Sequence, residues 1–192
     1  MRRREWAITT ASATAVVNLR GAALMFTLGG NAADRGGFFL VWRWGVGRGG
    51  TISTHRAFCG MRGSTATSTD VDPSTLPNIV GMGWDSTDTN IQFMHNDGSG
   101  TATKIDLGSG LPKPSTSDNT MYEIAMFAPP GTTQSLTYLV TDLVTGNTAT
   151  GVVTTDIPTT GQLLAPRGNI SVGGTSSVIG FVTSTVYIET DY

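Results

Sequence analysis

Apolar residues along this chain occur in short packets, which alternate with polar positions and are separated by glycine-rich segments. The clearest packet is residues 37–45, where six of the seven residues between the two flanking glycines are apolar. With a period of two, one face carries Phe38, Leu40, Trp42 and Trp44, and the other carries Phe39, Val41 and the single charge, Arg43. A strand that is apolar on both faces is central in its sheet. We expect the opposite sheet to cover one face, and loops, a partner chain or the first segment to cover the other.

The other packets predict about ten strands at spacings of roughly 8–15 residues, with no helical period longer than one turn. Residues 22–28 are the first firm strand expected, and the turn at 145–147 predicts a hairpin between its flanking strands. Residues 72–77 predict one turn of 3₁₀ helix. The pattern therefore predicts an all-β protein, a sandwich or jelly roll, with one domain at 20–192 and an N-terminal arm at 1–19.

Charged residues make up 14% of the chain, whereas glycine, threonine and serine are abundant, so we expect a surface of hydroxyl groups rather than ion pairs. The net charge of −2 gives no general attraction to nucleic acid or to an anionic membrane, and no run reaches the ~20 apolar residues of a membrane span. Ten of the twelve basic residues are arginine. This bias is compatible with subunit contacts and equally with genomic base composition.

Catalytic constellations are not visible. The single cysteine, Cys59, is expected to be a small buried hydrophobe, since nothing near it marks an activated thiol. His55 and His95 adjoin predicted loops, and the sequence has no Gly-x-Ser-x-Gly motif that would present a nucleophilic serine to them. The glutamates Glu5, Glu123 and Glu189 form no pair of the kind that glycosidases use. The sequence predicts a protein that is not an enzyme and has no catalytic residues and no cofactor.

Oxygen ligands for calcium could come from Asp85, Asp88 and Asn90 with Asp97, or from the pair at positions 70 and 72. Their spacing is not that of a calcium loop, and aspartate and asparagine are ordinary turn residues. We therefore predict no metal site.

A carbohydrate-binding site is the better-supported hypothesis at the same place. Trp84 ends a predicted strand and precedes the polar turn with Asp85, Asp88 and Asn90. A ring that stacks on a sugar beside acids that bind its hydroxyls would suit this arrangement. The alternative is that Trp84 anchors the core, where tryptophan buries a large area, while Asp85 and Asp88 bond turn backbone.

Several motifs resemble the C-terminal domain of a family of tailed-phage structural proteins, the tail fibre or phage tail proteins. The resemblance spans roughly residues 18–192 and rests on Gly36-Gly37-Phe38-Phe39, Trp42-Arg43-Trp44-Gly45, Arg56-Ala57-Phe58, Asp72-Pro73-Ser74-Thr75-Leu76, Tyr122-Glu123-Ile124-Ala125-Met126-Phe127-Ala128 and Val186-Tyr187-Ile188-Glu189. It implies a lectin-like, concanavalin-type β-sandwich displayed on a virion, often as a trimer. It supplies no catalytic residues.

Three hypotheses follow for the function. The first is a non-enzymatic virion protein, a tail fibre or spike tip, that binds a host surface glycan. The second is a purely architectural capsid or tail protein with other virion proteins as partners, and the third is a polysaccharide-degrading enzyme. We also expect a homotrimer, with candidate assembly residues Trp6, Trp42, Arg43 and Trp44.

Overall fold

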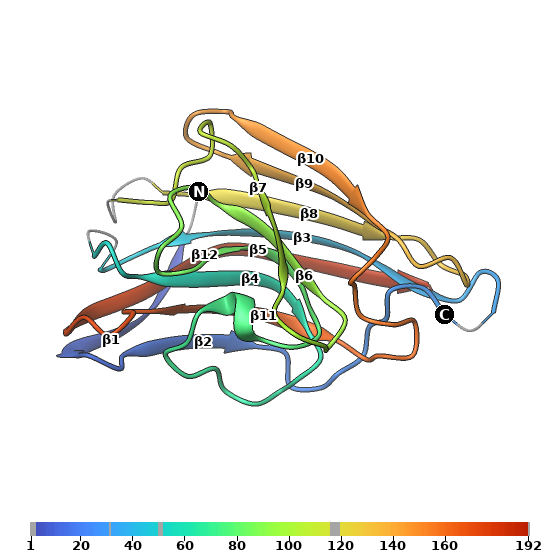
Figure 1. Cartoon of the computed structure of the whole chain (residues 1–192), viewed down its shortest axis with the longest axis horizontal. Coiled ribbons are helices and arrows are strands. Elements are labelled where there is room, and N and C mark those ends of the chain that lie inside the picture. The colour runs from blue at the N-terminus through green and yellow to red at the C-terminus, as the bar shows by residue number, and fades with distance from the viewer. Residues whose placement is uncertain (1–2, 31, 50–51, 116–119, 192) are drawn as a thin grey trace.

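The structure is a computed structural model that describes residues 3–30, 32–49, 52–115 and 120–191. Within these residues, twelve strands form two six-stranded antiparallel sheets that face each other as a sandwich (Figure 1). The predicted all-β sandwich is confirmed, with more strands than the sequence indicated. In the part of the chain so described, no helix is long and apolar enough to cross a membrane.

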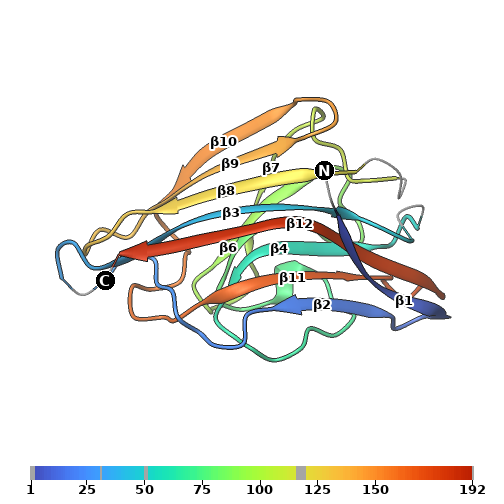
Figure 2. The same ribbon diagram turned by 180° about the vertical axis from the view of Figure 1, so that it is seen from behind.

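Each sheet mixes strands from distant parts of the chain. Sheet A has the spatial order β1 (Arg4–Ser12), β12 (Ser177–Asp191), β3 (Gly36–Val46), β8 (Tyr122–Ala128), β9 (Leu136–Asp142) and β10 (Thr148–Val153). Sheet B has the order β2 (Val16–Arg20), β11 (Ala165–Ser171), β4 (Arg56–Arg62), β5 (Ile79–Trp84), β6 (Gln92–Asn96) and β7 (Thr103–Asp106). The view from behind in Figure 2 shows β12, in red, passing between β1 and β3. A 3₁₀ turn, η1 (Pro73–Thr75), lies where the sequence predicted it.

The packet at 37–45 forms β3, a central strand of sheet A, as its two-sided apolar pattern predicts. Its inward face is fully buried, with Trp42 1% and Trp44 0% exposed. Trp42 donates its indole N–H to the Thr183 hydroxyl at 3.0 Å. The assembly role predicted for Trp42 and Trp44 is therefore wrong, because these rings fill the space between the sheets and cannot reach a partner chain.

An aromatic stack joins the two sheets at the centre of this core. The Trp44 ring lies 5.1 Å from the Phe181 ring of β12 and 5.5 Å from the Trp84 ring of β5, with interplanar angles of 9° and 13°. Stacked rings bury a large apolar area with defined geometry. The stack therefore joins β3 and β12 of sheet A to β5 of sheet B.

The N-terminal segment does not form a separate arm. Residues 4–12 pair with β12 in sheet A, and residues 16–20 pair with β11 in sheet B, so the segment adds one edge strand to each sheet. Residues 22–28 differ from the expected strand, because they make only an isolated bridge, between Phe26 and Leu164. In both cases backbone pairing with distant strands decides the structure, and the local pattern does not show that pairing.

A long connection covers much of the outer face of sheet B. Leu76 and Val71, from the segment between β4 and β5, pack on Phe58, Ile79 and Met94 of the sheet in a second apolar cluster. The glycines at positions 81 and 83 of β5 admit a close neighbour. The neighbour of Gly81 is the backbone of β4, since a Cβ on that residue would lie 2.4 Å from the Cys59 carbonyl oxygen.

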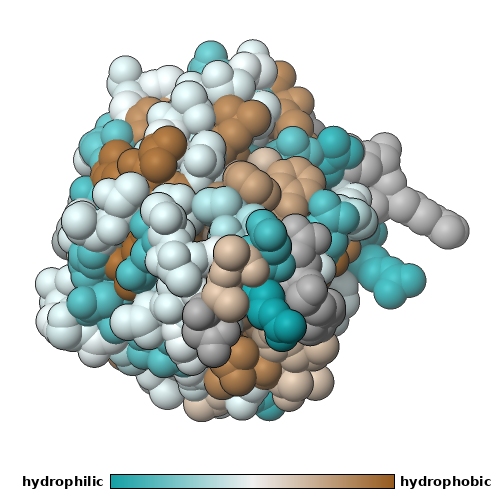
Figure 3. All heavy atoms as spheres, turned by 90° about the vertical axis from the view of Figure 1, so that its right-hand side faces the viewer, coloured by the Kyte–Doolittle hydropathy of each residue, from teal (hydrophilic) through white to brown (hydrophobic). Residues whose placement is uncertain are grey.

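Much of the surface is neither charged nor strongly apolar. Figure 3, which looks at one end of the sandwich, is dominated by the pale colour of intermediate hydropathy, with separate apolar patches. Threonine, serine and glycine have such hydropathy, and they are abundant in the chain. The view agrees with the predicted hydroxyl-rich surface.

Candidate functional site

Trp84 is not an exposed sugar-stacking ring. Its exposed fraction is 0%, it stacks on Trp44, and its indole N–H donates to Nδ1 of His55 at 3.0 Å. The alternative interpretation, a core anchor, is the one that the structure supports. The carbohydrate site predicted from Trp84 is corrected accordingly, since a ring with no exposed area cannot contact a sugar.

The acids that follow Trp84 are engaged within the protein. Asp85 and Asp88 accept from the Lys104 ammonium at 2.9 and 2.6 Å, and Asp88 also accepts from the backbone N–H of Asp85 at 2.8 Å. Asn90 donates to the Asp106 carboxylate at 3.0 and 3.2 Å. The polar side chains of the predicted glycan-binding turn are therefore bonded to β7 and to the turn's own backbone.

A second lysine occupies the same region. The Lys113 ammonium donates to the carbonyl oxygens of Ser53, Asp85 and Ser86 at 2.9, 3.2 and 2.8 Å. Burial lowers the pKa of Lys113 to about 8. Across the described ranges, no three His, Cys, Asp or Glu side chains are placed to hold a metal ion. The acids of this turn are paired with the Lys104 ammonium, and Lys113 binds the turn through its backbone carbonyl groups.

The remaining singled-out side chains are also structural. Burial raises the pKa of the Cys59 thiol well above its ordinary value, so the thiol is unreactive and the predicted buried hydrophobe is confirmed. His55 is buried, and its Nε2 lies 2.7 Å from the Pro114 carbonyl oxygen. His95 places Nδ1 2.9 Å from the Asp156 carbonyl oxygen. Both histidines thus have a backbone carbonyl oxygen as a ring-nitrogen partner.

The outer face of sheet A presents a surface that the sequence did not identify as a site. Strand register places its side chains in rows that run across five strands. The first row consists of Val152, Thr137, Phe127, Phe39 and Glu189. The second consists of Thr150, Leu139, Ala125, Val41 and Tyr187. We call these two rows the aromatic face.

Large apolar side chains are exposed on the aromatic face. The exposed fraction is 47% for Phe127, 39% for Leu139 and 49% for Tyr187. The Tyr187 ring lies 6.4 Å from the Phe39 ring in an edge-on arrangement. Contiguous exposed apolar surface on a folded protein marks a ligand groove or an interface.

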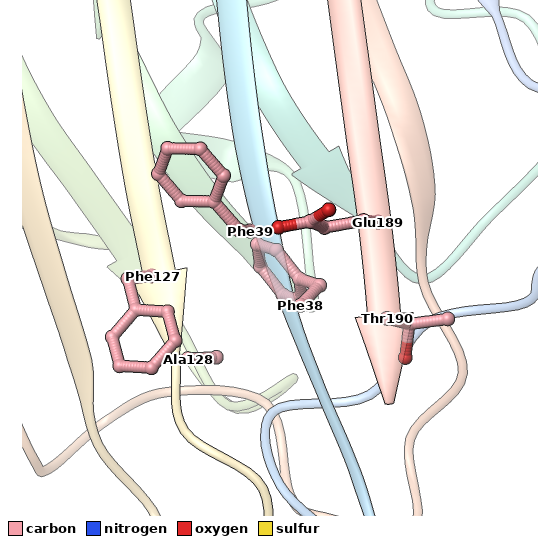
Figure 4. Close-up of a pocket in the computed structure, with 6 residues that line it drawn as sticks. All are labelled: Phe38, Phe39, Phe127, Ala128, Glu189 and Thr190. Carbon is pink, nitrogen blue, oxygen red and sulfur yellow. The ribbon is translucent and has the colours of Figure 1, made fainter. Parts of the chain in front are cut away.

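Two hollows lie on this face. Ala125 sits between Leu139 and Val41 in its row, and the larger neighbours around it enclose a hollow of about 190 Å³. A smaller hollow of about 50 Å³ lies between Phe39, Phe127, Glu189 and Thr190. Figure 4 shows Glu189 reaching from β12 toward β3, with Phe39 and Phe127 on the neighbouring strands.

Polar groups border the rings at one side. The Tyr187 hydroxyl donates to the Glu189 carboxylate, and this hydrogen bond, together with the negative charge, raises the pKa of Tyr187. Arg43 and Glu123 form an ion pair in the next row. The smaller hollow thus combines aromatic rings with a carboxylate acceptor, while the larger one is almost wholly apolar.

Two predicted assembly residues remain accessible. The Arg43 side chain is 39% exposed at the edge of the aromatic face, and Trp6 is 37% exposed on the edge strand β1. Their role in assembly stays a prediction. The sequence contained one indication of the aromatic face, which was the second apolar side of residues 37–45. A partner chain was one of the elements predicted to cover that side.

A scan against protein-family models and a search of curated proteins found no match to this chain. Solved structures share its fold. Lectin II from Ulex europaeus is 11% identical, with a TM-score of 0.58 over 97% of this chain and 86% of that one. Lotus tetragonolobus seed lectin is 9% identical, with a TM-score of 0.56 over 98% and 94%. The family 7 alginate lyase A1-II' in complex with product is 11% identical, with a TM-score of 0.53 over 98% and 79%. At such identities the likeness shows a lectin-like β-sandwich.

Proposed function

We propose that this protein is a non-enzymatic structural protein of a phage particle, a tail fibre or spike tip, that binds a bacterial surface glycan through its aromatic face. The observation that carries the proposal is the row in which Phe127, Phe39 and Glu189 lie side by side on an exposed sheet. Rings can pack on the C–H face of a sugar, and a carboxylate can accept from its hydroxyls. The motif resemblance to phage tail proteins supports the placement on a virion.

The two hollows suit different parts of a sugar. The smaller one, with Glu189, offers a hydrogen-bond acceptor beside aromatic rings. The larger one, with Ala125 as its floor, has room for an apolar substituent such as a methyl group. One of the lectins of this fold has been solved in complex with galactose. That neighbour supports carbohydrate as the ligand class to test first.

A glycan array of bacterial surface polysaccharides tests the binding. We expect the purified chain to bind a subset of glycans and Phe127→Ala to lose that binding, because one of the stacking rings is removed. Leu163→Ala is the control, since Leu163 is an exposed apolar residue outside both rows of the aromatic face.

Proteomics of purified phage particles tests the proposed location on a virion. Absence of the protein from the particles would contradict that location.

The apolar character of the larger hollow favours one alternative, an architectural protein whose aromatic face is a subunit interface. In that case the expected homotrimer buries Phe127 and Leu139 against a partner chain. Light scattering should then give about three times the monomer mass of 20.1 kDa, and Phe127→Ala should give the monomer mass. A trimer that survives Phe127→Ala and still binds glycan places its interface elsewhere, for example at Trp6 or Arg43.

A further inference from the structure

Three arginines gather on the outer face of sheet B, on the opposite side of the sandwich from the aromatic face. Arg20 of β2 pairs directly with Arg167 of β11, and Arg62 of β4 pairs with Ala165 of the same strand. Side chains of directly paired residues project to the same face of a sheet. The three guanidinium groups therefore lie together beneath the segment that follows β4.

Backbone carbonyl groups of residues 64–66 receive most of their hydrogen bonds. Arg167 donates to the carbonyl oxygens of Ser64, at 3.4 Å, and Ala66, and Arg20 donates to that of Thr65. Arg62 donates to the Ser68 hydroxyl at 3.1 Å. All of these acceptors are uncharged, so they satisfy hydrogen bonds and leave the positive charge unbalanced.

None of the ion pairs in the described part of the chain includes any of these arginines. The two acids of the covering segment bind elsewhere. Asp70 binds Arg56 and the backbone N–H groups of Gly173 and Gly174, and Asp72 binds Arg56 and the backbone N–H of Ser86. Buried charges are normally paired, because desolvating an unpaired charge is costly.

Two of the three arginines are deeply buried, and their hydrogen bonds are not fully satisfied. Arg167 is 1% exposed and Arg62 is 9% exposed, and the Nε of each has no hydrogen-bond partner. Burial, together with the charges of Arg62 and Arg20, lowers the pKa of Arg167 to about 10. Asn169, on the same face of β11, also has a buried amide oxygen without a partner. Two donors and one acceptor are thus left open.

We propose that Arg20, Arg62 and Arg167 form a binding site for an oxyanion carried by an acidic saccharide, a carboxylate or a sulfate ester, which replaces the carbonyl groups of residues 64–66. Guanidinium bonds to an anion are shorter and stronger than bonds to a neutral carbonyl, and they supply the missing charge. A hydroxyl of the sugar donates to the open oxygen of Asn169. The segment 64–68 is then the cover of the site, and it moves aside when the ligand binds.

Calorimetric titration of the full chain at constant ionic strength tests this site. The probes are sodium sulfate, an oligogalacturonate and a neutral galacto-oligosaccharide. We expect saturable binding of the oligogalacturonate, weaker binding of sulfate and none of the neutral sugar. Arg20→Gln removes an exposed side chain and should fold normally, and it should weaken binding about tenfold, as should Arg62→Gln.

Arg43→Gln is the matched control, because it removes an arginine from the outer face of sheet A, in the row next to the aromatic face, and it should bind oligogalacturonate as the wild type does. Phe127→Ala should also leave oligogalacturonate binding unchanged. The experiment therefore tests the arginine site independently of the glycan site proposed on the aromatic face. Absence of saturable binding to either anionic probe overturns the proposal, as does equal affinity in the wild type, Arg20→Gln and Arg62→Gln. Binding of sulfate without oligogalacturonate rejects the acidic saccharide as the ligand.

Discussion

At the scale of single residues, burial decides what Trp84 does. The sequence places a tryptophan beside acids, and that pattern suits a sugar site and a core anchor equally. The structure resolves the choice because β5 points the ring inward, onto Trp44. No local feature of the sequence shows which face of a strand meets the other sheet when apolar residues and glycine occupy both of its faces.

Trp84→Ala should therefore act on stability. Removing a fully buried indole leaves a cavity and an unstacked Trp44, so the free energy of unfolding should fall by about 3–5 kcal/mol. Denaturant unfolding measures the change. Trp6→Ala, at a ring that is 37% exposed, is the comparison and should cost much less. An unchanged free energy of unfolding in Trp84→Ala would contradict the core role.

His55 makes stability depend on pH. Its Nδ1 accepts from Trp84, which requires the neutral imidazole, and burial lowers its pKa from 6.5 to about 4. As pH falls below 6.5, the unfolded chain binds a proton that the folded chain does not bind until about pH 4. The free energy of unfolding should therefore fall over this window by roughly 3 kcal/mol on account of this group.

His55→Gln isolates that contribution, since glutamine can both accept from Trp84 and donate to the Pro114 carbonyl without titrating. Between pH 6.5 and 4 the variant should lose roughly 3 kcal/mol less than the wild type in matched denaturant unfolding. The pKa values of Asp70 and Asp72 are lowered from 3.8, so these groups reduce the free energy of unfolding mainly below that pH. They contribute little to the change between pH 6.5 and 4. Parallel pH profiles for the two proteins would show that His55 is not responsible.

At the scale of elements, predictions succeeded where the local pattern is strong. Residues 37–45 alternate apolar side chains on both faces, and they form the central strand β3. The hairpin of β9 and β10 follows from its turn and from alternating flanks. Residues 4–12 contain alanine, threonine and serine without clear alternation, and residues 16–20 form a strand of only five residues, so their pairing with β12 and β11 was not visible in the sequence.

Deleting residues 1–12 tests whether β1 is part of the sandwich. The deletion uncovers the edge of β12, and each lost backbone hydrogen bond contributes about 0.5–1.5 kcal/mol. The free energy of unfolding should fall by at least about 2 kcal/mol, and the exposed edge should promote association. Deleting residues 1–3 leaves β1 intact and serves as the control. Equal stability of both truncated chains and the full chain would indicate an independent arm.

At the scale of the whole molecule, the two outer faces differ. The connection after β4 covers much of sheet B, whereas sheet A exposes Phe127, Leu139 and Tyr187. The sequence indicated the apolar outward side of β3 but not the site, because Phe127, Phe39 and Glu189 become neighbours only through the register of three strands from distant parts of the chain.

The most direct test of glycan binding by the aromatic face is a calorimetric titration with a surface polysaccharide that the glycan array identifies. The wild type should bind saturably, and Phe127→Ala should bind at least about tenfold more weakly at an unchanged unfolding midpoint, because the ring is 47% exposed and leaves no core cavity. Leu163→Ala should match the wild type. Equal affinity of Phe127→Ala and the wild type would contradict the account.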